Sequence, residues 1–138
     1  MKIKLFLVLF SLSILTACTA TNPLNNTSWE LVSYGDLNSP TLALPDTNTY
    51  FSFKADNTIS GNAGCNTFSG EYKIKGDKLL IEQLAQTLMA CVDMAPMEQE
   101  SAVVTILSGS IEFEFNDNGL IIFSEDGLSA LTLARVEN

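Results

Sequence analysis

The chain has 138 residues, no histidine and a formal net charge of −9, and this length is enough for one domain around a single hydrophobic core. Nucleic acid and anionic lipid headgroups are disfavoured as partners, because binding them requires basic side chains that displace counterions from phosphates. The 16 acidic residues are scattered along the sequence, which is typical of a surface that promotes solubility and would also attract a basic partner.

The first seventeen residues have the pattern of an export signal. Lys2 and Lys4 form a basic start, and residues 5–15 are apolar apart from two serines. This run has the length of a signal-peptide core and is too short for a bilayer span of about 20 residues. It ends in Leu-Thr-Ala-Cys at residues 15–18, which resembles the lipobox of bacterial lipoprotein precursors. We therefore expect residues 1–17 to be a lipoprotein signal peptide rather than an ordinary signal cut at an Ala-x-Ala-like site.

The lipobox resemblance implies that Cys18 becomes the first mature residue and carries acyl groups such as palmitate, which anchor it in the lipid bilayer. Thr19 follows the anchor and is not aspartate; by resemblance to Gram-negative lipoproteins, this implies an outer-membrane location facing the periplasm. Residues 18–26 are polar and contain Pro23, so we expect a lipidated flexible tether. Without the signal, five basic residues remain against 16 acidic ones, a net charge of −11.

The folded domain is expected over residues 27–138, beginning at Thr-Ser-Trp. Short runs rich in β-branched and aromatic residues alternate with Gly, Asn and Asp turns, which is typical of antiparallel strands joined by hairpins. The expected strands are residues 29–34, 50–54, 58–61, 71–75, 78–82, 111–115, 120–123 and 130–134. Such strands favour a small curved sheet or a partly closed barrel, because both protect the edges of the sheet.

One segment, residues 96–108, predicts a helix. Pro96 suits a first helical turn, and Glu98 and Glu100 follow where negative charge favours a helix N-terminus. The helical period places several apolar residues together, and we expect them to pack on the sheet. These residues are Met97, Val103, Val104 and Leu107. The predicted fold is therefore α+β, mainly antiparallel β, with one late helix.

Cys65 and Cys91 remain after acylation of Cys18, and both lie inside the expected domain. Two thiols in an oxidising envelope are expected to pair, so we favour a structural disulfide over free reactive thiols. The alternative is a Cu(I) site, because thiolate and thioether sulfurs suit that ion. Its candidate ligands are Cys91, Met89, Met94 and Met97, with Cys65 nearby if the strands allow. Met89 and Met97 are better explained as core residues, and we expect no metal ion and no other cofactor.

Residues 61–70 contain three glycines, but they lie between strands and lack the Lys-Ser/Thr ending of a phosphate-binding loop. The glycines are better explained by a bend or a close backbone approach in the sheet. Asn66 lies within this segment, and we expect its side chain to hydrogen-bond the backbone of its own loop.

Several blocks of the domain agree in order and spacing with one known family. They are Trp-Glu-Leu at 29–31, residues 59–72 with Gly-Cys-Asn at 64–66, Thr-Leu-Met-Ala-Cys at 87–91 and Met-Glu-Gln-Glu at 97–100. Together they resemble the META domain, the family of HslJ-like heat-inducible lipoproteins. The resemblance implies a compact β-rich fold with one helix and an association with envelope or heat stress, and it implies no established catalytic activity. Thr67 and Leu88 depart from the polar or basic residues that relatives often carry there.

Three classes of function follow. We expect first a membrane-anchored, non-enzymatic envelope lipoprotein that is monomeric, contributes to stress tolerance and has no catalytic residues. The alternative is a binding module that holds a small apolar ligand in the barrel or captures a basic protein, as small acidic lysozyme-inhibiting lipoproteins do. An enzyme comes third, because the chain has no histidine and no nucleophile motif.

Overall fold

The computed structural model describes residues 21–45 and 47–137. This part of the chain forms one helix and nine strands. They are β1 (Thr27–Asp36), β2 (Thr41–Leu42), β3 (Tyr50–Phe53), β4 (Thr58–Asn62), β5 (Thr67–Lys75), β6 (Lys78–Gln86), α1 (Met94–Ile106), β7 (Gly109–Asn116), β8 (Gly119–Phe123) and β9 (Ser129–Arg135). The predicted signal peptide and Cys18 lie outside the described residues.

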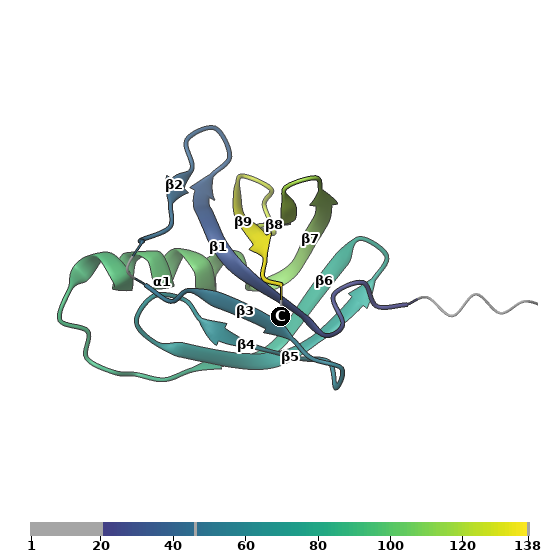
Figure 1. Ribbon diagram of the computed structural model, residues 1–138, viewed down its shortest axis with the longest axis horizontal. Helices are drawn as coiled ribbons and strands as arrows, with labels where there is room; N and C mark the ends of the chain where they lie inside the picture. The colour runs from purple at the N-terminus through teal and green to yellow at the C-terminus, as the bar shows by residue number, and fades with distance from the viewer. Residues whose placement is uncertain (1–20, 46, 138) are drawn as a thin grey trace, which may run out of the picture.

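Eight of these strands form a closed antiparallel barrel (Figure 1). From β3 to β9, each strand pairs with its neighbours in the chain, and β1 pairs with both β3 and β9. The β1–β9 pairing joins the two edges of the sheet, so the barrel is complete where the sequence predicted a curved sheet or partial closure. Strand β2 is a short addition beside the second half of β1.

Alternation of side chains builds the barrel wall. Along β1 the inward residues Thr27, Trp29 and Leu31 are buried, and on β7 Ile111 and Phe113 point inward while the acidic residues between and after them face solvent. The interior is filled by one apolar core. Its largest fully buried side chains are Trp29, Tyr72, Phe51, Phe53, Leu24, Ile59, Leu79, Leu107, Ile111, Leu120, Ile122 and Leu131.

The strands β5 and β6 are longer than the sequence predicted. Both extend past the expected ends, and Phe68 pairs with Gln86 four positions beyond the expected limit of β6. Apart from Phe68 and Leu84, the added residues are polar or small, and a register irregularity between Ser69 and Glu71 interrupts the alternation there. A prediction from residue pattern alone therefore ends each strand too early, because pairing with the neighbouring strand continues the strand past the end of the pattern.

Residues 22–26, which were expected to belong to the tether, pack against one end of the barrel. Leu24 is fully buried, and the side-chain amide of Asn22 donates to the Tyr72 hydroxyl at 2.9 Å. The Thr27 hydroxyl donates to the Leu24 carbonyl at 2.6 Å, and the Trp29 indole N–H donates to the Thr27 hydroxyl at 2.8 Å. The part of the chain that packs on the barrel thus begins before residue 27, at Asn22.

Helix α1 begins two residues before the predicted start and packs against β1 and β9. Its first turn contains no acidic residue, so the expected role of Glu98 and Glu100 at the helix N-terminus is wrong. The expected packing of Met97 is also wrong, because this side chain is 45% exposed. The buried residues of the helix are Gln99, Glu100, Val103 and Ile106. Among the described residues, no helix is both long enough and apolar enough to cross a membrane.

Candidate functional site

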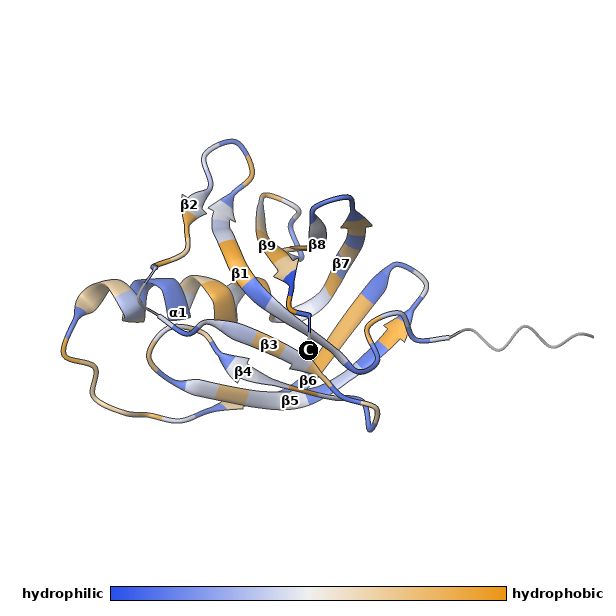
Figure 2. Cartoon of the chain, in the orientation of Figure 1, coloured by the Kyte–Doolittle hydropathy of each residue, from blue (hydrophilic) through white to orange (hydrophobic). Residues whose placement is uncertain are grey.

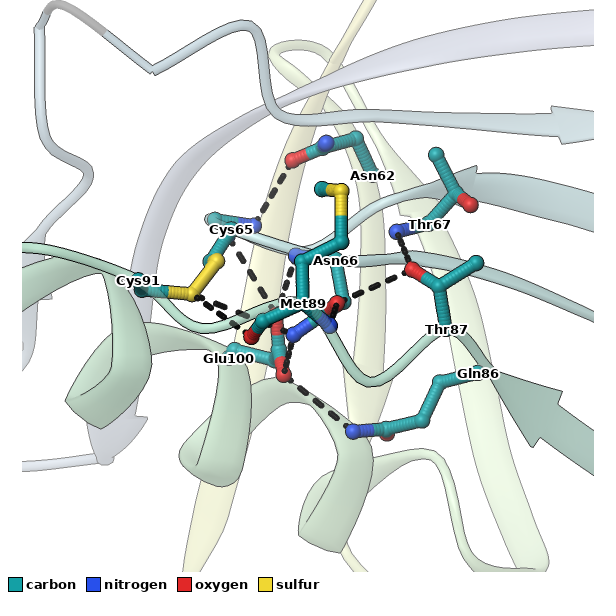
Figure 3. Close-up of a disulfide and its surroundings, with 10 residues drawn as sticks. Asn62, Cys65, Asn66, Thr67, Gln86, Thr87, Met89, Cys91 and Glu100 are labelled. Atoms are coloured by element: carbon teal, nitrogen blue, oxygen red, sulfur yellow. Dashed lines mark hydrogen bonds between the residues drawn. A yellow bond between two sulfur atoms is a disulfide. The ribbon is translucent and has the colours of Figure 1, made fainter.

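A disulfide and a set of buried polar side chains meet where the β4–β5 loop faces the segment before α1 (Figure 3). Cys65 lies in the β4–β5 loop and Cys91 lies between β6 and α1. Their sulfurs are bonded, and their Cα atoms are 6.2 Å apart. The bond closes a segment that contains β5 and β6, so it connects the barrel rim to the entry of the helix.

Asn66 connects three parts of the chain beside this disulfide. Its side-chain oxygen accepts hydrogen bonds from the Met89 backbone N–H at 2.7 Å and from the Thr87 hydroxyl at 2.9 Å. Its side-chain amide donates to Glu100 Oε1 at 3.0 Å. The expectation that Asn66 serves its own loop is wrong, because every one of these partners belongs to the β6–α1 segment or to the helix.

Glu100 is a buried carboxylate, 7% exposed, that is held by neutral donors. Oε2 accepts from the backbone N–H groups of Asn66 at 2.5 Å and Cys65 at 3.3 Å. Oε1 accepts from the Asn66 amide and from Gln86 Nε2 at 3.1 Å. The ion pairs in the described part of the chain join other residues, Lys73 with Glu82 and Lys78 with Glu112. Multiple hydrogen bonds therefore replace a countercharge around Glu100.

Gln99 makes a second polar connection from the same helix. It is fully buried. Its side-chain oxygen accepts from the Leu44 backbone N–H at 2.9 Å, and its amide donates to the Thr49 hydroxyl at 2.9 Å and to the Ala63 carbonyl at 3.1 Å. The first half of α1 is thus attached to the barrel through hydrogen bonds, whereas Val103 supplies apolar packing in the second half.

Gly64 lets the β4–β5 loop, residues 63–66, approach the helix closely; we call this loop the cysteine loop. Its φ of 155° is a value that side-chain-bearing residues rarely adopt, and a Cβ built there would collide with the Pro96 carbonyl oxygen. The neighbouring Gly64 N–H donates to the Asn62 side chain at 2.8 Å. The close backbone approach expected for this glycine-containing segment therefore occurs between the β4–β5 loop and the first turn of α1.

The sequence prediction missed Gln99 and Glu100 as binding partners of the cysteine loop. Their spacing from Val103 and Ile106 places all four residues on one helical face. That spacing was the sequence signal that could have predicted their burial. Met89 was expected in the core, and this is wrong because the side chain is 59% exposed. Cys91 is part of the disulfide, so its sulfur has no free thiolate for the alternative Cu(I) site.

This cluster is suited to holding segments together. Its donors and acceptors are paired with one another, and both sulfurs are bonded. Among the described residues, no group of three or more His, Cys, Asp or Glu side chains is placed to hold a metal ion. An open hollow of about 430 Å³ lies nearby over β4, β5 and β6, next to Gln86 and Thr87.

A second open hollow, of about 400 Å³, lies between β7 and the β8–β9 turn and has an acidic lining. Glu112, Glu114, Glu125 and Asp126 line it together with Lys78. Lys78 forms an ion pair with Glu112 at 3.3 Å, and both side chains are more than half exposed, so this pair adds little to stability. Both hollows lie on the outside of the barrel, because the apolar core fills its interior.

Comparison with known proteins gives a family and a fold. The META domain profile matches residues 22–137. An NMR structure of a protein from Burkholderia xenovorans is 23% identical, covers 83% of this chain and 85% of that chain, and has a TM-score of 0.68. The crystal structure of a DUF4847 family protein from Bacteroides vulgatus is 15% identical, covers 82% and 94% of the two chains, and has a TM-score of 0.61. Comparison with curated proteins finds no match.

Proposed function

This chain belongs to the META domain family, and we propose that it is a lipid-anchored, non-enzymatic lipoprotein of the bacterial envelope that contributes to envelope or heat-stress tolerance. The observation that carries the proposal is the Leu-Thr-Ala-Cys motif at residues 15–18 behind a short apolar run. Only three residues separate Cys18 from Asn22, where packing against the barrel begins. The domain would therefore sit close to the membrane that holds its lipid, in this proposal the outer membrane on its periplasmic side.

The interior of the domain supports a role without catalysis. The carboxylate oxygens of Glu100 accept hydrogen bonds from four donors, and the Cys65 and Cys91 sulfurs are bonded to each other. Glu100, Cys65 and Cys91 have side chains of the types that often react in enzymes, and here they attach α1 to the barrel. Because apolar side chains fill the barrel, a small apolar ligand has less support than a protein partner among the binding roles.

Lipid attachment is tested with Cys18→Ala in the full-length protein. We expect the wild type to incorporate a labelled palmitate analogue and to partition into the detergent phase, and the variant to do neither, because it lacks the acceptor thiol. The Cys65→Ala, Cys91→Ala double variant is the matched control and should be labelled as the wild type is. Equal labelling of Cys18→Ala would contradict the anchor.

The stress role is tested in a deletion strain of the source bacterium. Survival after heat and after an envelope-perturbing detergent is compared for strains that produce wild-type protein, Cys18→Ala or none. The wild type should restore survival, and Cys18→Ala should restore less if anchoring is required. Equal survival with and without the protein under both stresses would reject the stress role while leaving the anchor intact.

A further inference from the structure

Five large apolar side chains are exposed within ten residues at one end of the molecule. We call residues 88–97 the apolar segment. Its exposed members are Leu88 (90%), Met89 (59%), Val92 (99%), Met94 (70%) and Met97 (45%). Figure 2 shows hydrophobic colour along much of the loop that leads into α1. Soluble domains seldom gather this much exposed apolar surface unless it binds something.

The backbone of the apolar segment is fixed to the barrel. Cys91 is bonded to Cys65, the Met89 N–H donates to Asn66 at 2.7 Å, and the adjoining Thr87 N–H donates to the Thr67 carbonyl at 3.0 Å. A segment held at these points loses little backbone freedom on binding, which favours association. The hydrogen bonds shown in Figure 3 therefore hold the backbone of the segment in place, and the buried members of that network are Asn66 and Glu100.

The apolar segment lies at the opposite end of the molecule from the first described residues. In Figure 1 the loop before α1 forms one end, and the residues that precede β1 lie at the other. If Cys18 carries lipid, as proposed above, the four chain steps to Asn22 span at most about 14 Å. The anchored end of the barrel then faces the membrane, and the apolar segment faces away from it.

The charges around the apolar segment restrict its partner. Asp93 within the segment and Glu98 directly after it are exposed acidic residues, and the sequence contains no lysine or arginine from residue 79 to residue 134. Anionic lipid would be repelled by these carboxylates, as would the same segment on a second copy. The segment also protrudes, so two copies would not be self-complementary. A concave apolar surface with a basic rim complements it in shape and charge.

We propose that the apolar segment is a docking surface that inserts Leu88, Val92 and Met94 into an apolar cleft, bordered by lysine or arginine, of a periplasm-facing protein. The three methionines suit this role because their flexible thioether side chains adapt to a partner surface. The docking chemistry rests on the segment itself, whereas its orientation rests on the proposed lipid anchor.

The first experiment places a photo-crosslinking phenylalanine analogue at position 88 or 92 of the full-length protein in living cells. The control position is Leu128, which is 66% exposed on the β8–β9 turn and lies outside the segment. We expect positions 88 and 92 to crosslink the same protein, identified by mass spectrometry, through a peptide that borders an apolar, Lys- or Arg-rimmed cleft. Crosslinking of that protein equally from position 128, or from no position, would overturn the proposal.

The second experiment measures affinity with the purified partner and the mature chain carrying Cys18→Ala. Leu88→Ser with Val92→Ser should weaken binding at least tenfold, Asp93→Lys should weaken it several-fold, and Leu128→Ser should leave it unchanged. Unchanged melting temperatures would show that the variants remain folded, as expected for side chains outside the core. Because this chain carries no lipid, failure of the anchor prediction leaves the affinity comparison valid.

Two other outcomes would replace the proposal with a different occupant. Sedimentation of the same chain with vesicles of phosphatidylethanolamine and phosphatidylglycerol at 3:1, lost in the Leu88→Ser, Val92→Ser variant, would assign the segment to lipid. A concentration-dependent dimer in sedimentation velocity that the same variant abolishes would assign it to a second copy.

Discussion

At the scale of single residues, Asn66 connects the cysteine loop to the β6–α1 segment and to the helix. Its oxygen serves Thr87 and Met89 and its amide serves Glu100, and the residue is 5% exposed. A side chain with both a donor and an acceptor is required, because one end faces donors and the other faces a carboxylate.

Asn66→Asp tests this requirement. The substitution keeps the acceptor but places a second carboxylate oxygen 3.0 Å from Glu100 in a buried site. We expect the free energy of unfolding to fall by about 3 kcal/mol, measured by urea denaturation, because like charges repel and a donor is lost. Asn62→Asp is the matched control and should stay within about 0.5 kcal/mol of wild type, since Asn62 only accepts from the Gly64 N–H.

Adding Glu100→Gln to Asn66→Asp restores a donor opposite the new carboxylate, and part of the lost stability should return. A double variant that is less stable than Asn66→Asp alone would mean that repulsion between the two carboxylates is not the cause. Sequence alone indicated Cys65 and Cys91 but not this network. The residue type of Asn66 shows that its side chain needs hydrogen bonds. Which groups it bonds to depends on how α1 lies across the β4–β5 loop, and the sequence does not show this.

At the scale of elements, the hairpins were predictable and the polar face of the helix was not. Asp56 before β4 and Asp126 before β9 mark turns by their residue types and were found in such turns. Helix α1 was located to within two residues, and Val103 and Leu107 are buried as predicted. Gln99 and Glu100 were missed on the inward face because the prediction considered only apolar residues. Gln99 and Glu100 are buried because backbone groups at the barrel rim have no partner in the sheet and bond to these side chains instead. A pattern of apolar residues along the sequence does not show where such backbone groups lie.

The turns also give a pH prediction. The Thr58 hydroxyl, and then its backbone N–H, donate to Asp56 and lower the pKa of that carboxyl. The Ser124 hydroxyl, and then the Leu128 N–H, lower the pKa of Asp126 in the same way. Each folded-state pKa is below the unfolded-state value, so the contribution to stability is present above the unfolded-state pKa and is lost as pH falls through the folded-state pKa.

Carboxyl NMR titration distinguishes the two turns. Thr58→Val should raise the pKa of Asp56 and leave that of Asp126 unchanged, and Ser124→Ala should do the reverse, because each substitution removes one hydroxyl donor. Each variant is the control for the other. A shift of both carboxyls in either variant would indicate a change in the whole fold instead of a local bond.

At the scale of the whole molecule, the disulfide stabilises the domain by restricting the unfolded chain. Cys65 and Cys91 are 26 positions apart, for which loss of loop-closure entropy predicts about 3.5 kcal/mol. The Cys65→Ser, Cys91→Ser variant should therefore unfold at a lower urea concentration and still fold, because the barrel is closed by strand pairing. Reduced wild type is the control and should match the variant. Equal midpoints for oxidised and reduced wild type would refute a stabilising role.

Barrel closure itself sets an order of events for the growing chain. Trp29 pairs with Arg135, and the Val136 N–H donates to the Ser28 carbonyl at 2.9 Å, so the first strand and the last are neighbours. The barrel cannot close until residue 135 has left the ribosome. Until then β1 lacks its partner β9, so folding cannot be completed early, which would suit the export proposed above.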